Sequence, residues 1–462
     1  MRLKTVPWLL TAGLAVGVLA QASDSIRVFR RSSAPSTVSA YRDGEVIVVF
    51  SKTIELPEVE RTLREGGAVA ARSGRIVRLA RRYLVTLEPG MTVPEAVEHF
   101  NQMAGVDYAE PNGIVRKSQA TTFTPNDEFF EFQWNMSLIG AERTWAIQKG
   151  QGSVGVAVLD TGVAYEDYVD PVTGQVFGKA PDWGSTTFLP GWDAVNEDSH
   201  PNDDEWHGTH VSSTIAEATN NSLGLAGLAF ECSLMPVKVL DQFGEGTFFD
   251  VAEGIDYAAS FEQGGERPVK VINMSFGAET VSETVRRALD RAYQNGVVLV
   301  AAAGNSGREG IDFPAREANV IAAGAVDARG ERAPYSSTGP ELDLLGPGGN
   351  CSRDDDNDGE FDCVFQQMPD PDSVIQGIHT DFCLCGLDGT SMASPHVAAA
   401  AALLVSQGIT DPDSVRAALE QTADGTAAEG QRNDLEGYGL IQPAAALSGL
   451  GFDQGPVNQE TP

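Results

Sequence analysis

An aspartate, a histidine and a serine that lie far apart in the sequence could together perform nucleophilic catalysis. Asp160 follows the apolar run "VAVL", His207 opens "HGTHV", and Ser391 lies in "GTSMASPHVA". A serine hydroxyl is a weak nucleophile until an imidazole takes its proton, and a carboxylate fixes the tautomer of that imidazole. Asn305, in "AAAGNSG", could donate its amide to the oxyanion that forms when a serine attacks a carbonyl. Each residue alone also suits an ordinary turn or helix cap, so the chemistry depends on the elements that position it.

Those elements follow an alternating α/β pattern. From residue 153 onward, continuous apolar runs such as "SVGVAVLD", "VKVINMSFG" and "GVVLVAAAGN" end in polar residues or glycine, with helical segments between them. Fully apolar strands predict a parallel sheet that is covered on both faces, and such sheets bind ligands beyond the carboxyl ends of their strands. We therefore expect an α/β fold with a doubly wound, mostly parallel sheet over residues 119–450, and a flexible tail over 451–462.

The first 118 residues have a different organisation. A charged start, an apolar stretch over residues 8–19 and the small-residue motif "AQA" predict an export signal over residues 1–22. In the segment 23–118, strand patterns at 44–50, 81–87 and 106–115 alternate with helix patterns at 56–67 and 92–103. This order predicts a small α+β domain at about 44–115. We expect the mature protein to be secreted or periplasmic and not to remain in a membrane.

The net charge of the chain is concentrated in its larger part. The formal charge of the whole chain is −33, but residues 119–462 hold 16 basic and 53 acidic residues, a charge of −37. Residues 23–118 hold 14 basic and 12 acidic residues and are nearly neutral. A segment this acidic remains soluble and favours bound cations. Because it repels nucleic acid, we expect no nucleic-acid partner.

Five sequence blocks resemble the signature blocks of one enzyme family. "VAVLDTGV", "HGTHV", "INMSFG", "AAAGNSG" and "GTSMASPHVA" are similar to those of subtilisin-like serine proteases, and they occur in the family's order. The resemblance spans roughly residues 125–450. It implies that Asp160 orients the base, that His207 rather than His210 is the base, that Ser391 is the nucleophile and that Asn305 contributes to the oxyanion hole. More weakly, residues 44–115 resemble the inhibitory propeptide of secreted members.

The resemblance also implies residues that bind substrate. Ser275, Phe276 and Gly277 resemble the edge segment that pairs with an extended peptide. Asp312, in "IDFPA", precedes a Phe-Pro pair that resembles the lining of the family's main specificity pocket, where a carboxylate would favour Lys or Arg. The stretch "IVRKSQA" (114–120) would supply a basic self-cleavage site at the end of the propeptide.

Two blocks resemble a structural calcium site. "APDW" (180–183) resembles the block whose aspartate binds calcium, which indicates Asp182, and "TNNSLGLAG" (219–227) resembles the loop that supplies further ligands, which indicates Asn221. Calcium takes six to eight oxygen ligands from carboxylates, amides and carbonyls, and this composition suits it. The alternative is a hydrogen-bonded turn without metal.

An acidic insertion over residues 350–386 departs from the compact family pattern. Its stretch "CSRDDDNDGEFDC" (351–363) places carboxylates in the first, third, fifth and ninth positions of an EF-hand-like loop, at Asp354, Asp356, Asp358 and Asp362. Position twelve is Phe365 instead of glutamate, and no flanking helices are evident, so we do not expect a true EF-hand. Mutual repulsion of the carboxylates favours a calcium-binding loop, and the alternative is a solvated flap.

Four of the five cysteines cluster in this insertion. Export favours disulfides over zinc, and Cys351 and Cys363 are expected to bond each other or to cross to Cys383 and Cys385. The Cys-x-Cys spacing is expected to be too tight for a bond of its own.

The sequence thus predicts a secreted, calcium-stabilised serine endopeptidase that is made as an autoprocessed zymogen and acts as a monomer. Its expected partners are protein or peptide substrates and its own propeptide. Two alternatives stay open: a peptide ligase or cyclase on the same scaffold, and a non-catalytic, calcium-dependent surface binding protein.

Overall fold

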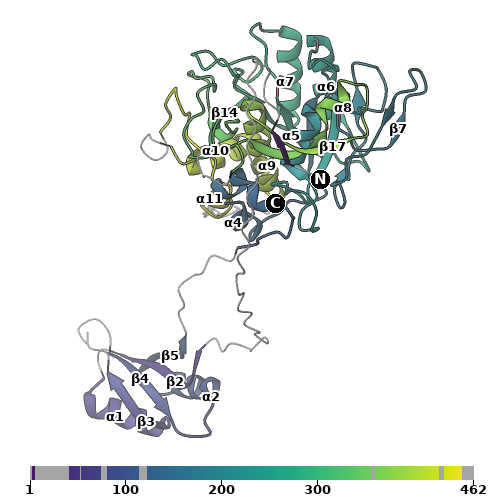
Figure 1. Cartoon of the computed structure of the whole chain (residues 1–462). Helices are drawn as coiled ribbons and strands as arrows, with labels where there is room; N and C mark the ends of the chain where they lie inside the picture. Colours follow the sequence, from purple (N-terminus) through teal and green to yellow (C-terminus); the bar gives the residue numbers. More distant parts are fainter. Residues whose placement is uncertain are drawn as a thin grey trace. The chain divides into compact units, whose positions relative to one another are not determined.

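The computed structural model describes residues 3–5, 41–51, 54–73, 81–113, 122–354, 359–425 and 431–449. The chain divides into two compact units, one over Gly13–Gln119 and the other over Met1–Ala12 with Ala120–Pro462 (Figure 1). Each unit has its own hydrophobic core, and each is described by itself.

The N-terminal unit is a four-stranded antiparallel sheet, in the order β3-β4-β2-β5, with two helices. Its elements are β2 (Tyr41–Phe50), α1 (Leu56–Glu65), β3 (Ala68–Ser73), β4 (Arg81–Leu87), α2 (Val93–Asn101) and β5 (Val106–Gly113). Thr92 caps α2 in a reciprocal capping box with Glu95, and Phe100 of α2 is buried with the inward side chains of β2. The prediction of a small α+β domain is confirmed, except that β3 was not foreseen, because its alanines form strands poorly.

The larger unit contains an eight-stranded parallel sheet. Seven strands run in the order β10-β11-β6-β12-β13-β14-β15, and β9 also pairs with β11. The strands are β6 (Gly155–Asp160), β9 (Thr187–Phe188), β10 (Trp192–Asp193), β11 (Ser233–Lys238), β12 (Val269–Met274), β13 (Val298–Ala302), β14 (Val320–Val326) and β15 (Leu344–Pro347). Every residue of β6, β11, β13, β14 and β15 is buried, as the continuous apolar runs require.

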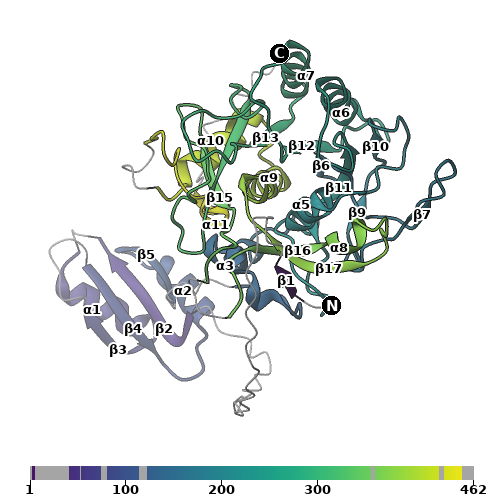
Figure 2. The same cartoon turned by 45° about the horizontal axis from the view of Figure 1, so that its top comes forward.

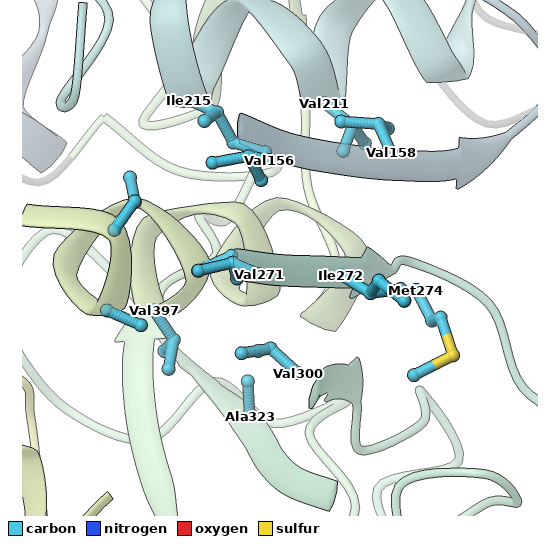
Figure 3. Close-up of a cluster of buried hydrophobic side chains, with 14 of the residues drawn as sticks. Val156, Val158, Val211, Ile215, Val271, Ile272, Met274, Val300, Ala323 and Val397 are labelled. Carbon is cyan, nitrogen blue, oxygen red and sulfur yellow. The ribbon is translucent and has the colours of Figure 1, made fainter. Parts of the chain in front are cut away.

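Helices cover both faces of this sheet, which confirms the doubly wound prediction. In Figure 2, α6 (Phe248–Ser260) and α7 (Glu283–Gln294) lie on one side, and α5 (His207–Ala216) and α9 (Thr390–Ser406) lie on the other. Figure 3 shows Val211 and Ile215 of α5 against Val156 and Val158 of β6. The alanine-rich α9 packs against α5 and against β12 to β15. Small residues permit this close approach, since a Cβ on Gly346 would lie 2.7 Å from the carbonyl oxygen of Ala393.

Shorter elements complete this unit. They are a 3₁₀ turn (Phe130–Phe132), α3 (Trp134–Leu138), α4 (Ala141–Trp145), β7 (Tyr168–Val169), β8 (Val176–Phe177), α8 (Pro371–Val374), α10 (Pro412–Thr422) and α11 (Pro443–Gly449). An antiparallel pair, β16 (Val364–Pro369) and β17 (Phe382–Leu387), leads directly into α9. The strand β1 (Leu3–Thr5) pairs in parallel with β17, and the rest of the expected export signal and the expected tail lie outside the described residues.

Both cysteine pairs near β16 and β17 form bonds. Cys351 is bonded to Cys363, and Cys383 is bonded to Cys385. The expectation that the Cys-x-Cys spacing is too tight is wrong, because residues two apart on a strand point to the same face. Their Cα atoms lie 5.4 Å apart, which is within the usual range for a disulfide. Cys232 is buried and free.

No helix among the described residues is both long enough and apolar enough to cross a bilayer.

Candidate active site

Asp160 and His207 form a hydrogen-bonded pair at the carboxyl edge of the sheet. Asp160 is the last residue of β6, and His207 is the first residue of α5. The Nδ1 atom of His207 lies 2.8 Å from Oδ1 of Asp160, whose side chain is fully buried. This carboxylate holds the imidazole with a proton on Nδ1, which leaves Nε2 to accept a proton from another group.

A network of buried hydrogen bonds fixes the start of α5 beside β6. The hydroxyl of Thr161 accepts the backbone N–H of Gly208 and donates to Asp203, and Asp203 in turn accepts the backbone N–H of Thr209. Lys238, at the end of β11, is also buried, and its ammonium donates to the carbonyl oxygen of Thr161 and to Asp204. A side chain at Gly208 would collide with the carbonyl oxygen of Gly162, in the turn that follows β6, so glycine is required at position 208. The sequence analysis did not foresee this network, because its members are polar residues with no common local pattern.

Charges around the imidazole favour its protonated form. Burial alone would lower the pKa of His207, but the charge and hydrogen bond of Asp160, with the charges of Glu205 and Asp203, raise this pKa to about 9. Glu205 accepts the backbone N–H of His207 at 2.7 Å, and burial raises the pKa of this glutamate to about 7. These charges therefore shift the neutral form of this imidazole, the form that can accept a proton, toward higher pH.

The second histidine of the block has a structural position. His210 is buried, and its Nε2 atom lies 2.9 Å from the carbonyl oxygen of Val364 in β16. Burial lowers the pKa of His210 to about 3 and keeps its imidazole neutral. It faces β16 and makes no hydrogen bond with Asp160.

Ser391 lies in the first turn of α9. Gly389 precedes the helix with φ of 151°, and the backbone N–H of Ser391 has no acceptor within the helix. The Ser391 hydroxyl donates to the carbonyl oxygen of Ser275 at 2.9 Å, and the Ser275 hydroxyl donates to the carbonyl oxygen of Ser391 at 2.9 Å. Since α5 and α9 pack together, the elements that carry His207 and Ser391 are neighbours.

Asn305 has its amide oriented toward the same helix start. Its Oδ1 atom accepts hydrogen bonds from the backbone and from the hydroxyl of Thr390, both at 2.9 Å. These two bonds place the Nδ2 atom near Gly389, where a Cβ would lie 3.4 Å from it. Asn305 is exposed, so this N–H group can donate to a ligand above Ser391.

The three residues expected to bind peptide follow β12. Ser275 is buried, Phe276 is half-buried and Gly277 is exposed. Phe276 and Gly277 border a cavity of about 350 Å³, which the stretch from Gly244 to Phe248 also lines. Asp312 lies directly below this segment, because a Cβ on Gly277 would be 2.7 Å from the Cβ of Asp312.

The expected calcium residues lie together with two carboxylates that the sequence analysis missed. Asp182 accepts a hydrogen bond from the Asn221 amide at 2.6 Å, and its second oxygen is buried without a partner among the described residues. Glu217 is fully buried beside Asp182, and neither of its oxygens has such a partner. Asp127 accepts the backbone N–H groups of Asn220 and Asn221 at 2.8 and 3.0 Å. Burial raises the pKa of Asp182 to about 6, and burial and the Asp182 charge raise that of Glu217 well above its usual value.

This donor set suits calcium. Orphaned buried oxygens are stabilised by a cation, and calcium combines carboxylates with amide and carbonyl oxygens. Within the described ranges, no three His, Cys, Asp or Glu side chains are arranged to hold a metal by themselves. An ion here would therefore need the amide oxygen of Asn221 and backbone carbonyls as well.

The acidic stretch is described only at its two ends. Asp354 is exposed, whereas Asp362 is buried and its backbone pairs with Asn350. Asp356 and Asp358 lie outside the described residues. The predicted loop site therefore stays a prediction.

Known proteins resemble this chain over both units. The model of the subtilase family matches residues 151–439, and that of the fervidolysin N-terminal prodomain matches residues 31–112. A thermophilic serine proteinase from a Bacillus species is 36% identical over 386 residues, which cover 83% of each chain. Thermitase from Thermoactinomyces vulgaris is 35% identical over 324 residues, which cover 69% of this chain and 100% of thermitase. A solved protease structure from Pseudoalteromonas arctica matches with a TM-score of 0.60 and 30% identity, and covers 71% of this chain and 99% of its own. The chain therefore belongs to the subtilase family and is a subtilisin-like serine endopeptidase with an N-terminal prodomain.

Proposed function

We propose that Ser391 is the nucleophile, His207 the general base and Asp160 the residue that orients this base. Ser391 exchanges its hydrogen bond to Ser275 for one to Nε2 of His207, gives up its proton there and attacks a peptide carbonyl. Protonated His207 then donates its proton to the leaving amine, which leaves an acyl-enzyme. In a second step, water hydrolyses this ester and regenerates Ser391. The observation that carries the proposal is the 2.8 Å contact between His207 and the buried carboxylate of Asp160.

The oxyanion of each tetrahedral intermediate lies between two donors in this proposal. One is the backbone N–H of Ser391 in the first turn of α9, and the other is the Nδ2 group of Asn305. The two hydrogen bonds from Thr390 orient Asn305 before substrate arrives, so little reorganisation is needed during the reaction.

Labelling by a fluorophosphonate probe tests the nucleophile. The mature enzyme should react with the probe, and Ser391→Ala should abolish both labelling and peptide hydrolysis. Ser137→Ala is a matched control, because Ser137 is an exposed serine in α3. Labelling of folded Ser391→Ala at the same rate as the control would refute the assignment. Diversion of the acyl-enzyme to an added amine in preference to water would indicate a ligase.

The N-terminal unit is proposed to act as an intramolecular inhibitor that the enzyme removes itself. The match to a prodomain model and the separate core of this unit support the proposal. The expected cleavage stretch, "IVRKSQA" (residues 114–120), lies outside the described residues. Ser391→Ala should accumulate the unprocessed proprotein. Normal maturation of that variant, with no other protease present, would refute self-processing.

Calcium is proposed to bind at Asp182, Glu217, Asn221 and Asp127. The ion would neutralise carboxylates that are otherwise buried without a partner, and thereby stabilise the loop over residues 219–225. Asn220 and Ser222 of this loop, neither of them glycine, adopt positive φ angles of 63° and 65°, so their conformation needs support from surrounding contacts. A second calcium site in the acidic loop remains a proposal. If Asp356→Ala combined with Asp358→Ala leaves the calcium stoichiometry unchanged, that loop is only a solvated flap.

The enzyme is proposed to act outside the cytoplasm on protein or peptide substrates. The disulfides Cys351–Cys363 and Cys383–Cys385 need an oxidising compartment, and the first 22 residues have the pattern of an export signal. N-terminal sequencing of the exported protein tests this assignment.

A further inference from the structure

Asp312 lies between the two backbone segments that border the catalytic centre. Its N–H donates to the carbonyl oxygen of Ala303 at 3.0 Å, and the next residue, Phe313, pairs with Ala278 through two backbone hydrogen bonds of 2.7 and 2.9 Å. One neighbouring segment thus continues from Ala303 to the oxyanion donor Asn305. The other runs back from Ala278 to Ser275, whose carbonyl oxygen contacts the Ser391 hydroxyl.

The Asp312 side chain occupies the space between these segments. A Cβ on Gly277 would lie 2.7 Å from the Cβ of Asp312, and a Cβ on Gly304 would lie 2.4 Å from its Oδ2 atom. Both neighbours must therefore be glycine for this side chain to fit. The carboxylate consequently lies beside Gly304, which directly precedes Asn305. It also lies beside Gly277, which is two residues after Ser275.

This carboxylate has no hydrogen bond or ion pair to any other side chain that the structure describes. Asp312 is half-buried, and burial raises its pKa above the ordinary value for aspartate, while the charge of Arg316 lowers it and that of Glu279 raises it. The Arg316 guanidinium donates to the carbonyl oxygens of Ala278 and Glu279 and forms no ion pair with Asp312. A half-buried carboxylate without a partner is unfavourable, and a cationic group from outside would compensate it.

We infer that Asp312 forms the floor of the pocket for the residue on the amino side of the scissile bond, and that it makes the enzyme select Lys or Arg there. The inference rests on the proposed function, because it takes Ser391 and Asn305 as the point of attack. In this arrangement a lysine or arginine side chain enters between the segments of Gly277 and Gly304 while its carbonyl stays at Ser391. The charge of −37 on residues 119–462 also attracts cationic substrates to the enzyme.

A purely structural role for Asp312 makes a different prediction. In that case Asp312 would only support the turn that precedes Pro314, and its replacement would lower stability without changing which peptides are cleaved. The decisive quantity is therefore a ratio of specificities rather than a rate.

The test compares two peptides that differ only at this position, one with Arg and one with Phe. Asp312→Asn keeps the shape of the side chain and removes its charge. It should lower kcat/KM for the Arg peptide by about 100-fold, the effect of removing one member of a desolvated charge pair, and leave the Phe peptide within about threefold. The matched control is Glu279→Gln, an exposed carboxylate whose charge also acts on Asp312, and it should leave the Arg-to-Phe ratio within about threefold.

An unchanged ratio in folded Asp312→Asn would overturn the inference, even though the enzyme itself remained active. If the mature wild-type enzyme does not react with the fluorophosphonate probe, the proposed function is refuted, and this inference is refuted with it. If Asp312→Asn does not fold, benzamidine and the neutral benzyl alcohol are compared as inhibitors of Phe-peptide cleavage by the wild-type enzyme. Competitive inhibition by benzamidine at least tenfold stronger than by benzyl alcohol is expected, and equal inhibition would overturn the inference.

Discussion

Chelation of calcium should make the stability of this enzyme strongly dependent on pH. Burial raises the pKa of Asp182 from 3.8 to about 6, so the folded protein without calcium holds a proton that the unfolded chain releases. The contribution of Asp182 to the free energy of unfolding should therefore be highest below pH 4 and should be lost as the pH rises to about 6. The raised pKa of the adjacent Glu217 acts in the same direction.

The size of this loss follows from the shift at Asp182. A difference of about two pH units corresponds to roughly 3 kcal/mol of unfolding free energy. At about 2 °C per kcal/mol for a domain of this size, the Tm should fall by roughly 6 °C between pH 4 and pH 7 because of Asp182 alone. Calcium bound at the proposed site would remove this loss, because both carboxylates would then be ionised and compensated by the ion.

The assay is thermal unfolding of mature enzyme that a serine-directed inhibitor has inactivated, so that self-digestion does not interfere. Tm is measured from pH 4 to pH 8 with excess calcium and with excess chelator. The difference between the two Tm curves should widen up to about pH 6. Taking this difference cancels the contribution of buried carboxylates elsewhere, because they affect both curves equally. Glu217→Gln should narrow the difference and weaken calcium binding in calorimetry. Curves that remain parallel, or that coincide at every pH, would refute the reasoning.

Three further predictions concern the proposed catalytic residues and a charge beside them. Glu205→Gln removes a negative charge that helps to raise the pKa of His207, so the acid limb of the kcat/KM profile should move to lower pH, and an unmoved limb would contradict the assigned electrostatics. Asn305→Ala should lower kcat by about 100- to 1,000-fold, the loss that removal of subtilisin's own oxyanion asparagine causes, with KM nearly unchanged; a rise in KM alone would indicate a role in substrate binding. Asp160→Asn should lower kcat by roughly 10⁴-fold without loss of fold, as the equivalent substitution does in the serine-protease triad, and steady-state kinetics with circular dichroism check both parts.

The sequence was most informative where function depends on a short local pattern. Asp160, His207, Asn305 and Ser391 each lie at a strand end or helix start that the apolar runs mark, so their common location at one sheet edge follows from topology. The α/β fold was predictable for the same reason, because strands that are buried on both faces have few alternatives.

The residues that were missed depend on contacts between distant segments. Glu217 directly follows the helix α5, and Asp127 lies near the start of the larger unit's main segment, Ala120–Pro462. Nothing in the sequence of either segment indicates that both residues lie close to Asp182. Lys238 likewise ends an apolar strand, and only the folded chain reveals Asp204 as its partner. The Cys383–Cys385 bond was excluded by a rule about spacing, although strand geometry permits it.

The Cys351–Cys363 bond has a consequence for the life of an enzyme that is surrounded by copies of itself. A cut anywhere between these cysteines leaves both fragments joined covalently, with the downstream fragment still entering β16 at Val364. Nicked molecules should run as one species on a non-reducing gel and as two on a reducing gel, with their activity retained. Self-digestion between Cys351 and Cys363 can thus occur without the loss of the strand pair that leads to Ser391.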